Sequence, residues 1–262
     1  MSFILATMKK VLVTGATGKT GSLVFQKLKH QPEEFEVVGF ARSPEKAEQI
    51  FSSTKDFVFG DIANKSQIET AIEGCDALVI LTSAVPKMVA PPSEGKPPEF
   101  AYDPEGMPEN VDYHGQLNQI DAAKQAGVEH IVLVGSMGGT KQDHVLNRMG
   151  NGNILVWKRK AEQYLIDSGI DYTIIRAGGL LNEPGGVREL LVGKDDLLSI
   201  NPPDGATNSI PRDDVATLVV NALKEPNARN KAFDVVSKAE DAPDASVTSD
   251  FASLFAQTTG GL

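Results

Sequence analysis

Short apolar runs alternate with longer amphipathic segments along most of this chain. Each run is apolar throughout rather than at every second position, which is typical of strands buried on both faces of a sheet. The intervening segments repeat their apolar residues at helical spacing. The predicted strands are residues 11–14, 35–40, 57–59, 77–81, 130–134 and 172–176, and the predicted helices are residues 18–30, 44–51, 65–73, 111–126 and 154–168. This alternation predicts an α/β fold built on a doubly wound parallel sheet.

The pattern loosens after residue 176. Residues 188–192 indicate a helix, residues 233–236 a late strand and residues 247–255 a final helix. Another helix is predicted to begin near Pro211, because proline and the acidic residues that follow suit a first turn. Since this C-terminal portion, residues 177–262, is too short and too dependent on the sheet to fold alone, we expect one domain over residues 1–262. The C-terminal portion is expected to complete the substrate pocket.

Residues 82–111 form an unusually long, proline-rich connection after the fourth strand. Its prolines are Pro86, Pro91, Pro92, Pro97, Pro98, Pro104 and Pro108. Long loops in compact domains are usually functional or disordered. This loop leaves the carboxyl end of a central strand, where doubly wound sheets bind ligands. We interpret it as a lid or wall of the active cleft, with a passive linker as the alternative.

The charge balance argues against two classes of partner. The 262 residues include 25 Lys and Arg against 35 Asp and Glu, a net charge of −10. Nucleic acids and anionic membrane surfaces both require a basic surface. No apolar run approaches the length of a membrane-spanning helix, so we expect no membrane insertion. A small-molecule substrate fits this composition, a protein partner stays open, and no oligomeric state is assigned.

Cysteine usage and the N-terminus bear on location. Cys75 is the sole cysteine, so no internal disulfide can form and a reducing compartment is expected. We interpret Cys75 as a half-buried packing residue rather than a nucleophile. The apolar stretch at residues 3–6 is too short for a signal peptide, and nothing there resembles a full transit peptide. The predicted location is the cytoplasm, or the plastid stroma in a plant or alga.

The strongest motif is Gly-x-x-Gly-x-x-Gly, which directly follows the first predicted strand. Gly15 permits a tight turn, Gly18 lets the backbone approach a pyrophosphate, and Gly21 lets the next helix pack against the strand. The N-terminus of that helix offers free N–H groups to the phosphates. The motif predicts a dinucleotide site on a Rossmann fold. The loop residues Thr17, Lys19 and Thr20 are assigned to the same site.

The end of the second strand indicates which dinucleotide binds. NAD enzymes usually place an acidic residue there to hold the ribose 2′-hydroxyl. This chain has Arg42 instead, and a guanidinium can bind a 2′-phosphate through two charge-assisted hydrogen bonds. The alternative is a solvated surface arginine. We predict NADP(H) as the cofactor.

Two further strand ends are assigned to the cofactor site. Asp61 and Ile62 follow the third strand, where the adenine would lie, although Asp61 would also suit a cap for the helix expected from Asn64. The residues after the fourth strand should pass beneath the nicotinamide-side ribose. They are Leu81, Thr82 and Ser83.

Five segments together resemble a known family. They are the glycine motif at 15–21 and residues 76–86, 127–136, 157–162 and 171–176. The chain resembles the atypical short-chain dehydrogenases of the NmrA-like group. It is especially similar to plant and cyanobacterial NAD(P)-binding proteins related to the chloroplast import component of 62 kilodaltons. The resemblance covers nearly the whole chain and implies the fold and the nucleotide, whereas many members have no assigned reaction.

In active short-chain dehydrogenases a serine after the fifth strand acts with a Tyr-x-x-x-Lys pair on the next helix. By this resemblance, Ser136 would orient the substrate oxygen and Lys158 would hold the cofactor ribose. The position four residues earlier, where the phenol should stand, is then Ile154. If Lys160 were the lysine, that position would be Val156. Neither register supplies a phenol, although Tyr102 and Tyr113 lie on or beside the long loop and could reach the site.

Other candidate chemistry is weaker. Asn118 matches a position where relatives often carry asparagine, and it would order a proton-relay water or satisfy nearby backbone. The four histidines show no metal-ligand spacing, so no metal is predicted. Ser136 lacks the Gly-x-Ser-x-Gly elbow of a hydrolase.

Two functions from different classes remain. The first is an NADP(H)-dependent oxidoreductase that reduces a small carbonyl, enone or quinone-like compound without the usual catalytic tyrosine. The second is a catalytically weak protein that senses NADP(H) or acts as a scaffold and reports redox state to a partner. A sugar-nucleotide epimerase is a third interpretation, but it also requires the missing tyrosine.

Overall fold

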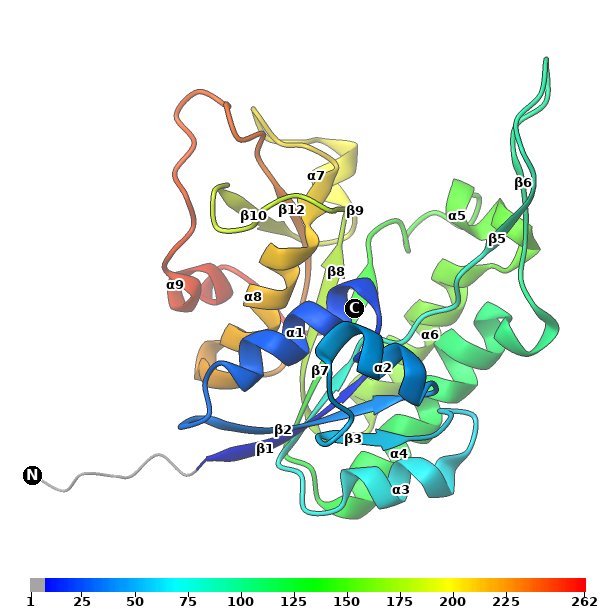
Figure 1. Ribbon diagram of the computed structural model, residues 1–262. Helices are drawn as coiled ribbons and strands as arrows, with labels where there is room; N and C mark the ends of the chain where they lie inside the picture. The colour runs from blue at the N-terminus through cyan, green and yellow to red at the C-terminus, as the bar shows by residue number, and fades with distance from the viewer. Residues whose placement is uncertain (1–7) are drawn as a thin grey trace, which may run out of the picture.

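The computed structural model describes residues 8–262, so the apolar stretch at residues 3–6 lies outside the described residues. An eight-stranded sheet forms its centre, in the order β10-β12-β8-β7-β4-β1-β2-β3 (Figure 1). Neighbouring strands run parallel except β10, which is antiparallel to β12. The strands are β1 (Lys9–Thr14), β2 (Phe35–Ala41), β3 (Phe57–Phe59), β4 (Ala77–Ile80), β7 (His130–Ser136), β8 (Asp171–Ala177), β10 (Leu190–Gly193) and β12 (Lys231–Ser237).

Helices cover both faces of this sheet (Figure 1). Apolar side chains of α1 and α8 form one core with the sheet, and those of α3, α4 and α6 form the other. The longer helices are α1 (Lys19–Lys29), α2 (Pro44–Phe51), α3 (Lys65–Ile72), α4 (Gly115–Ala126), α6 (Ile154–Asp167) and α8 (Arg212–Lys224). The predicted fold class, a single doubly wound domain, is confirmed.

The first strand shows why the apolar runs are continuous. Val11 and Val13 belong to the core under α1 and α8, while Leu12 belongs to the opposite core. All three side chains are fully buried. A strand between two helical layers has no solvent face, so every position is apolar.

The prediction of a helix at residues 188–192 is wrong. Residues Leu190–Gly193 form β10, which pairs with β12 through Leu190 and Ser237 at one end of the ladder. A short apolar run does not distinguish helix from strand, and here the free edge of β12 decides the outcome. The last helix is also shorter than predicted. It is α9 (Phe251–Ala256), capped by the Asp250 side chain, which accepts a hydrogen bond from the Ser253 N–H at 3.0 Å.

The proline-rich connection has structure of its own. After β4 it forms the hairpin of β5 (Lys87–Ala90) and β6 (Glu99–Ala101), which projects from the body of the molecule (Figure 1). It then continues through a 3₁₀ turn, Pro104–Gly106, into a π-helix, Glu109–His114. The helix predicted at 111–126 therefore begins as a π-helix and becomes the α-helix α4 only at Gly115. The smaller elements are β9 (Gly179–Leu181), β11 (Ser209–Pro211), α5 (Val145–Arg148) and α7 (Leu197–Ile200).

Cys75 lies just before β4 and is buried. Burial, which disfavours the thiolate, raises the pKa of its thiol to about 11. The thiol packs in the core, which fits the predicted packing role, but it is buried rather than half-buried. Within residues 8–262, no helix combines the length and apolar character needed to cross a bilayer.

Candidate functional site

The glycine motif forms a close contact between β1, β4 and α1. Gly15 has a φ of +69°, and a Cβ added there would lie 2.8 Å from the Leu81 carbonyl oxygen. A Cβ added at Gly21 would lie only 2.1 Å from the Gly15 carbonyl oxygen. Hence Gly15 makes the turn past β4, and Gly21 lets α1 approach that turn.

The N-terminus of α1 has the features that a pyrophosphate requires. Gly18 is the N-cap, no side chain caps the helix, and the first turn carries no acidic residue. The nearest atom to a Cβ added at Gly18 would be the Gly15 oxygen at 3.0 Å. The open face of the turn and the free N–H groups fit a dinucleotide phosphate. Thr17 and Thr20 are half-buried beside this turn, and Lys19 is exposed.

Arg42 directly follows β2 and is exposed. The next residue, Ser43, caps α2 by accepting a hydrogen bond from the Lys46 N–H at 3.1 Å. The nearby acid, Glu45, accepts a hydrogen bond from the Ser43 hydroxyl at 2.8 Å. No acid therefore takes the place of the ribose-binding carboxylate at the end of β2.

We expect Arg42→Ala to remove most of the preference for NADPH over NADH. A bidentate contact between a guanidinium and a phosphate contributes about 1.5–3 kcal/mol, or about ten- to a hundredfold in affinity. Calorimetric titration of both cofactors measures the preference directly. Arg42→Lys, which retains the charge but loses the planar fork, should lie between the wild type and alanine. Equal affinities of the wild type for the two cofactors would refute the assignment.

The loop after β3 is fixed by side chains from two helices. The Asp61 carboxylate accepts a hydrogen bond from the Ala63 N–H at 2.8 Å, and Gln67 accepts one from the Asp61 N–H at 2.8 Å. The Asp61 side chain does not cap α3, which begins at Lys65 with Asn64 as its N-cap. The Asn118 amide donates to the Ile62 oxygen at 3.0 Å. Asn118 thus holds the backbone of the loop after β3, which is the second of its two predicted roles.

Beyond β4 the chain passes close to the glycine motif. The Leu81 carbonyl faces Gly15. The Thr82 hydroxyl accepts a hydrogen bond from the Gln119 amide at 3.2 Å, and Ser83 is exposed. These three residues lie at the carboxyl edge of the strand next to β1.

Ser136 ends β7 and is half-buried. Its hydroxyl donates to the Met137 carbonyl at 3.0 Å. The loop that follows is anchored by Asp196, which accepts hydrogen bonds from the Gly138 N–H at 2.6 Å and the Thr140 N–H at 2.9 Å. Although burial alone would raise it, the hydrogen bond from the Thr140 hydroxyl, together with these two N–H bonds, holds the pKa of Asp196 below its usual value. Ser136 therefore stands on a strand end whose loop has a fixed backbone.

The two candidate lysines have different environments. The Lys158 side chain is 8% exposed, and its Nζ lies 2.7 Å from Oδ1 of Asp112. Lys160 is exposed, with its Nζ 4.2 Å from the centre of the Trp157 ring. Lys158 is thus the inward-facing lysine. Ile154, one turn earlier on α6, is half-buried.

None of the four tyrosines stands one turn before Lys158 on α6, but Tyr102 lies near Asp112, the partner of Lys158. Burial, and then the charge of Asp112, raise the pKa of the Tyr102 hydroxyl. The Tyr102 ring lies against Gly150 and Gly152, so that a Cβ added at Gly152 would come within 2.6 Å of it. The Tyr113 ring lies 5.5 Å from that of Trp157. Tyr164 donates to Asp121, and Tyr172 accepts from the Gly261 N–H. None replaces the phenol on the helical face of Lys158.

Sequence reasoning missed Asp112, which is fully buried on the π-helix. Gln116 and Gln119 are also buried, so the segment carries a polar face turned toward the protein interior. The available signal was the spacing of these three residues, which places them on one helical face. A polar stripe on a helix normally faces solvent, and the sequence alone does not show that α6 covers this one.

A cluster of buried charged side chains connects α6 to β8 and β12. Arg176 on β8 donates from Nε to Glu162 on α6 at 2.8 Å, and its Nη1 lies 3.9 Å from Asp234 on β12. Asp234 accepts a hydrogen bond from the Asp196 N–H at 2.7 Å, while its burial raises the pKa of the Asp234 carboxyl. The cluster links the helix that carries Lys158 to the residue that anchors the loop after Ser136.

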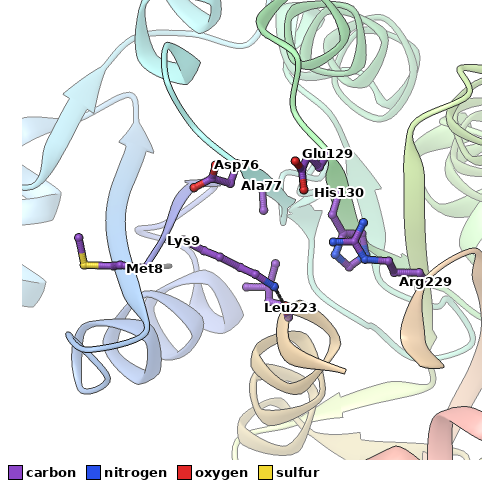
Figure 2. Close-up of a pocket in the computed structure, with 8 residues that line it drawn as sticks. All are labelled: Met8, Lys9, Asp76, Ala77, Glu129, His130, Leu223 and Arg229. Carbon is purple, nitrogen blue, oxygen red and sulfur yellow. Dashed lines mark hydrogen bonds between the residues drawn. The ribbon is translucent and has the colours of Figure 1, made fainter. Parts of the chain in front are cut away.

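A separate pocket of about 150 Å³ lies at the amino edge of the sheet, opposite the glycine motif (Figure 2). Its lining residues are Met8, Lys9, Asp76, Ala77, Glu129, His130, Leu223 and Arg229. The cations here have protein partners: Lys9 donates to the Leu223 oxygen at 2.5 Å, and Arg229 pairs with Asp171 at 2.7 Å. Burial, aided by the charges of Arg229 and Lys9, lowers the pKa of His130 to about 3. Both cations of this pocket are thus held by protein partners, and the pocket lies at the amino ends of the strands, away from the candidate cofactor site.

Residues 8–262 contain no group of three or more His, Cys, Asp or Glu side chains placed to hold a metal ion.

Comparison with known proteins identifies the family. The model of an NAD(P)H-binding family matches residues 15–226. An uncharacterised chloroplastic protein of Arabidopsis thaliana is 55% identical over 251 residues, covering 95% of this chain and 75% of that protein. Sanguinarine reductase of Eschscholzia californica is 52% identical over 269 residues, covering 95% of this chain and 96% of that enzyme.

Solved structures agree on the fold. A Bacillus halodurans structure of the NAD-dependent epimerase/dehydratase kind superposes with a TM-score of 0.68 at 24% identity, covering 95% of this chain and 99% of that one. These matches confirm the resemblance inferred from the motifs, and the nucleotide motif at residues 15–21 falls at the start of the family match. The chain therefore belongs to the NAD(P)H-binding family of Rossmann-fold proteins.

Proposed function

We propose that this protein is an NADPH-dependent reductase of a small conjugated electrophile, such as an enone or a quinone-like compound. The observation that carries the proposal is an inward-facing Lys158 whose helical face holds Ile154 in place of a phenol. When bound, NADPH supplies a hydride. Lys158 would donate hydrogen bonds to the ribose on the nicotinamide side, and the Ser136 hydroxyl would orient the acceptor oxygen.

The missing phenol favours conjugated acceptors over simple carbonyls. A simple carbonyl that accepts a hydride becomes an alkoxide and needs a proton donor in the transition state, a contribution of about 10²- to 10⁴-fold. A quinone spreads the new charge over its ring, and a conjugated cation becomes neutral. Both tolerate an apolar wall such as Ile154. Simple carbonyls should therefore be reduced, but slowly.

The relatives support catalysis over sensing. The Eschscholzia californica protein is named as a reductase and matches this chain across almost its full length. The absence of a phenol is the observation that favours the alternative, a weakly catalytic NADP(H) sensor or scaffold. A reductase that acts mainly on conjugated acceptors would equally lack the phenol.

Steady-state NADPH oxidation tests the proposal. The panel would contain a simple aldehyde, an enone, a quinone and a conjugated iminium salt. We expect the conjugated acceptors to turn over at least about tenfold faster than the aldehyde, because they need no proton from the protein. If NADPH binds but none of the four is reduced, the sensing alternative holds. If the aldehyde is the fastest, the proposed acceptor class is wrong.

For location, we propose the plastid stroma or the cytoplasm. The similar Arabidopsis thaliana protein is named as chloroplastic, which supports the first. A fluorescent fusion to the C-terminus of the full-length protein would distinguish them in the source cells.

A further inference from the structure

The carboxylate of Asp112 is enclosed by two partners from separate parts of the chain. Its Oδ1 lies 2.7 Å from the Lys158 ammonium on α6. Its Oδ2 accepts a hydrogen bond from the Ala84 N–H at 2.9 Å, just beyond Thr82 and Ser83. The side chain has no exposed surface, so this is not a solvated acid near a cation.

A buried ion pair is a costly way to stabilise a fold. Removing two charges from water offsets much of their attraction, and apolar side chains of similar volume often stabilise a protein as well or better. Asp112 and Lys158 therefore stabilise the fold little more than well-packed apolar side chains would. What the pair provides is a defined position for an ammonium group, because both carboxylate oxygens are already oriented.

The π-helix determines where this carboxylate lies. Residues Glu109–His114 form the π-turn, and the regular α4 begins at Gly115. Such turns are uncommon and often occur at functional sites, because the extra residue re-aims the side chains. Here Asp112 meets Lys158, and the same helical face continues to Gln119, which donates to Thr82 at 3.2 Å. Lys158 and Thr82, on the two sides of the expected nicotinamide ribose, thus both contact the continuous helical segment of residues 109–126.

We propose that Asp112 is a positioning residue for NADPH. It holds the Lys158 ammonium at the carboxyl edge of β4 and fixes the backbone after Ser83 in the same contact. The contact is an ion pair without a hydrogen bond to Oδ1, so the N–H groups of the Lys158 ammonium remain available to ribose hydroxyls. The pair also has no net charge, so Lys158 binds the ribose as a directed donor rather than as a free cation. This inference rests only on the cofactor half of the proposed function.

The test compares NADPH with adenosine 2′,5′-bisphosphate, which contains only the adenine end of the cofactor. Calorimetry would be performed on the wild type, Asp112→Asn, Lys158→Met and the double variant. We expect Asp112→Asn to weaken NADPH binding about tenfold, the effect of losing one charge-assisted contact, with unchanged affinity for the bisphosphate. The double variant should bind NADPH no more weakly than Lys158→Met alone, because Asp112 acts through that lysine.

Asp214→Asn is the matched control. Asp214 is also a buried acid with a backbone partner, the Gly186 N–H at 2.7 Å, but it lies at the start of α8 on the other face of the sheet. Its substitution should leave both ligand affinities at the wild-type value. Thermal unfolding of each variant accompanies the titrations.

The outcomes separate the inference from the proposed function. Equal losses for both ligands, or additive losses in the double variant, would mean that Asp112 merely stabilises the fold. NADPH affinity within twofold of the wild type in Asp112→Asn would overturn the inference outright. If Asp112→Asn does not fold, the double variant replaces it, because that variant leaves neither charge without its partner. NADPH affinity of the double variant is then compared with that of Lys158→Met. Weaker binding by the double variant contradicts the inference. A wild type that binds neither ligand would refute the cofactor assignment itself.

Discussion

Replacement of Gly18 by valine is expected to abolish NADPH binding while the protein stays folded. Gly18 caps α1 with φ −77° and ψ 167°, an extended conformation open to any residue. An added Cβ would meet only the Gly15 oxygen, at 3.0 Å, so the turn must yield by a few tenths of an ångström, far less than at Gly21. A branched side chain would instead occupy the space where the pyrophosphate meets the N–H groups. We expect affinity to fall by more than about a hundredfold, or about 2.7 kcal/mol, in calorimetric titration.

Gly21→Ala provides the contrast within the same motif. Its methyl group would lie 2.1 Å from the Gly15 oxygen, a backbone atom that cannot move without displacing α1. This variant should lose thermal stability, whereas Gly18→Val should unfold near the wild-type temperature. Normal cofactor binding by folded Gly18→Val would mean that the phosphates bind elsewhere.

Ile154→Tyr is expected to raise turnover of a simple carbonyl by about a hundredfold, the lower range for a general acid. The phenol would stand one helical turn before Lys158, on the same face of α6. The ammonium favours the phenolate and so lowers the pKa of the new hydroxyl, although Asp112 at 2.7 Å from that ammonium opposes the effect. Steady-state rates on an aldehyde measure the gain.

Ile154→Phe is the control for this substitution. It adds the same ring without the hydroxyl, so any gain from packing alone would appear in both variants. Lys158→Ala should weaken NADPH binding in either background. A wild type already fast on simple carbonyls, and unaffected by these changes, would show that the chemistry lies elsewhere.

Much of the fold was predictable because its strands are buried on both faces. Val11, Leu12 and Val13 must all be apolar in such a strand, so the run is visible in the sequence without any partner. Leu190–Gly193 is different, since its strand state comes from pairing with β12, more than forty residues later. Local periodicity carries no information about that edge.

The candidate site was predictable where a residue type has a fixed role. Gly15 and Gly21 are required by backbone contacts, and the sequence alone indicated them. Asp112 was missed although its spacing to Gln116 and Gln119 was visible, because a polar stripe on a helix normally faces solvent and the π-turn is not apparent from the sequence. Asn118, on α4, donates instead to the backbone of the loop after β3, a contact between distant segments that the sequence does not indicate.

The buried Cys75 makes this protein convenient for spectroscopy. Its thiol is the sole one in the chain, lies in the interior and stays protonated near neutral pH, because its pKa is about 11. The wild-type protein is therefore expected not to react with maleimide dyes, so that only an introduced cysteine is labelled. Trp157, the sole tryptophan, lies next to Lys158 on α6. A cysteine placed at Met88, exposed on the β5 strand of the projecting hairpin, would carry an acceptor dye opposite that native donor. One substitution, Met88→Cys, thus gives a single donor–acceptor distance between the hairpin and the helix that carries Lys158.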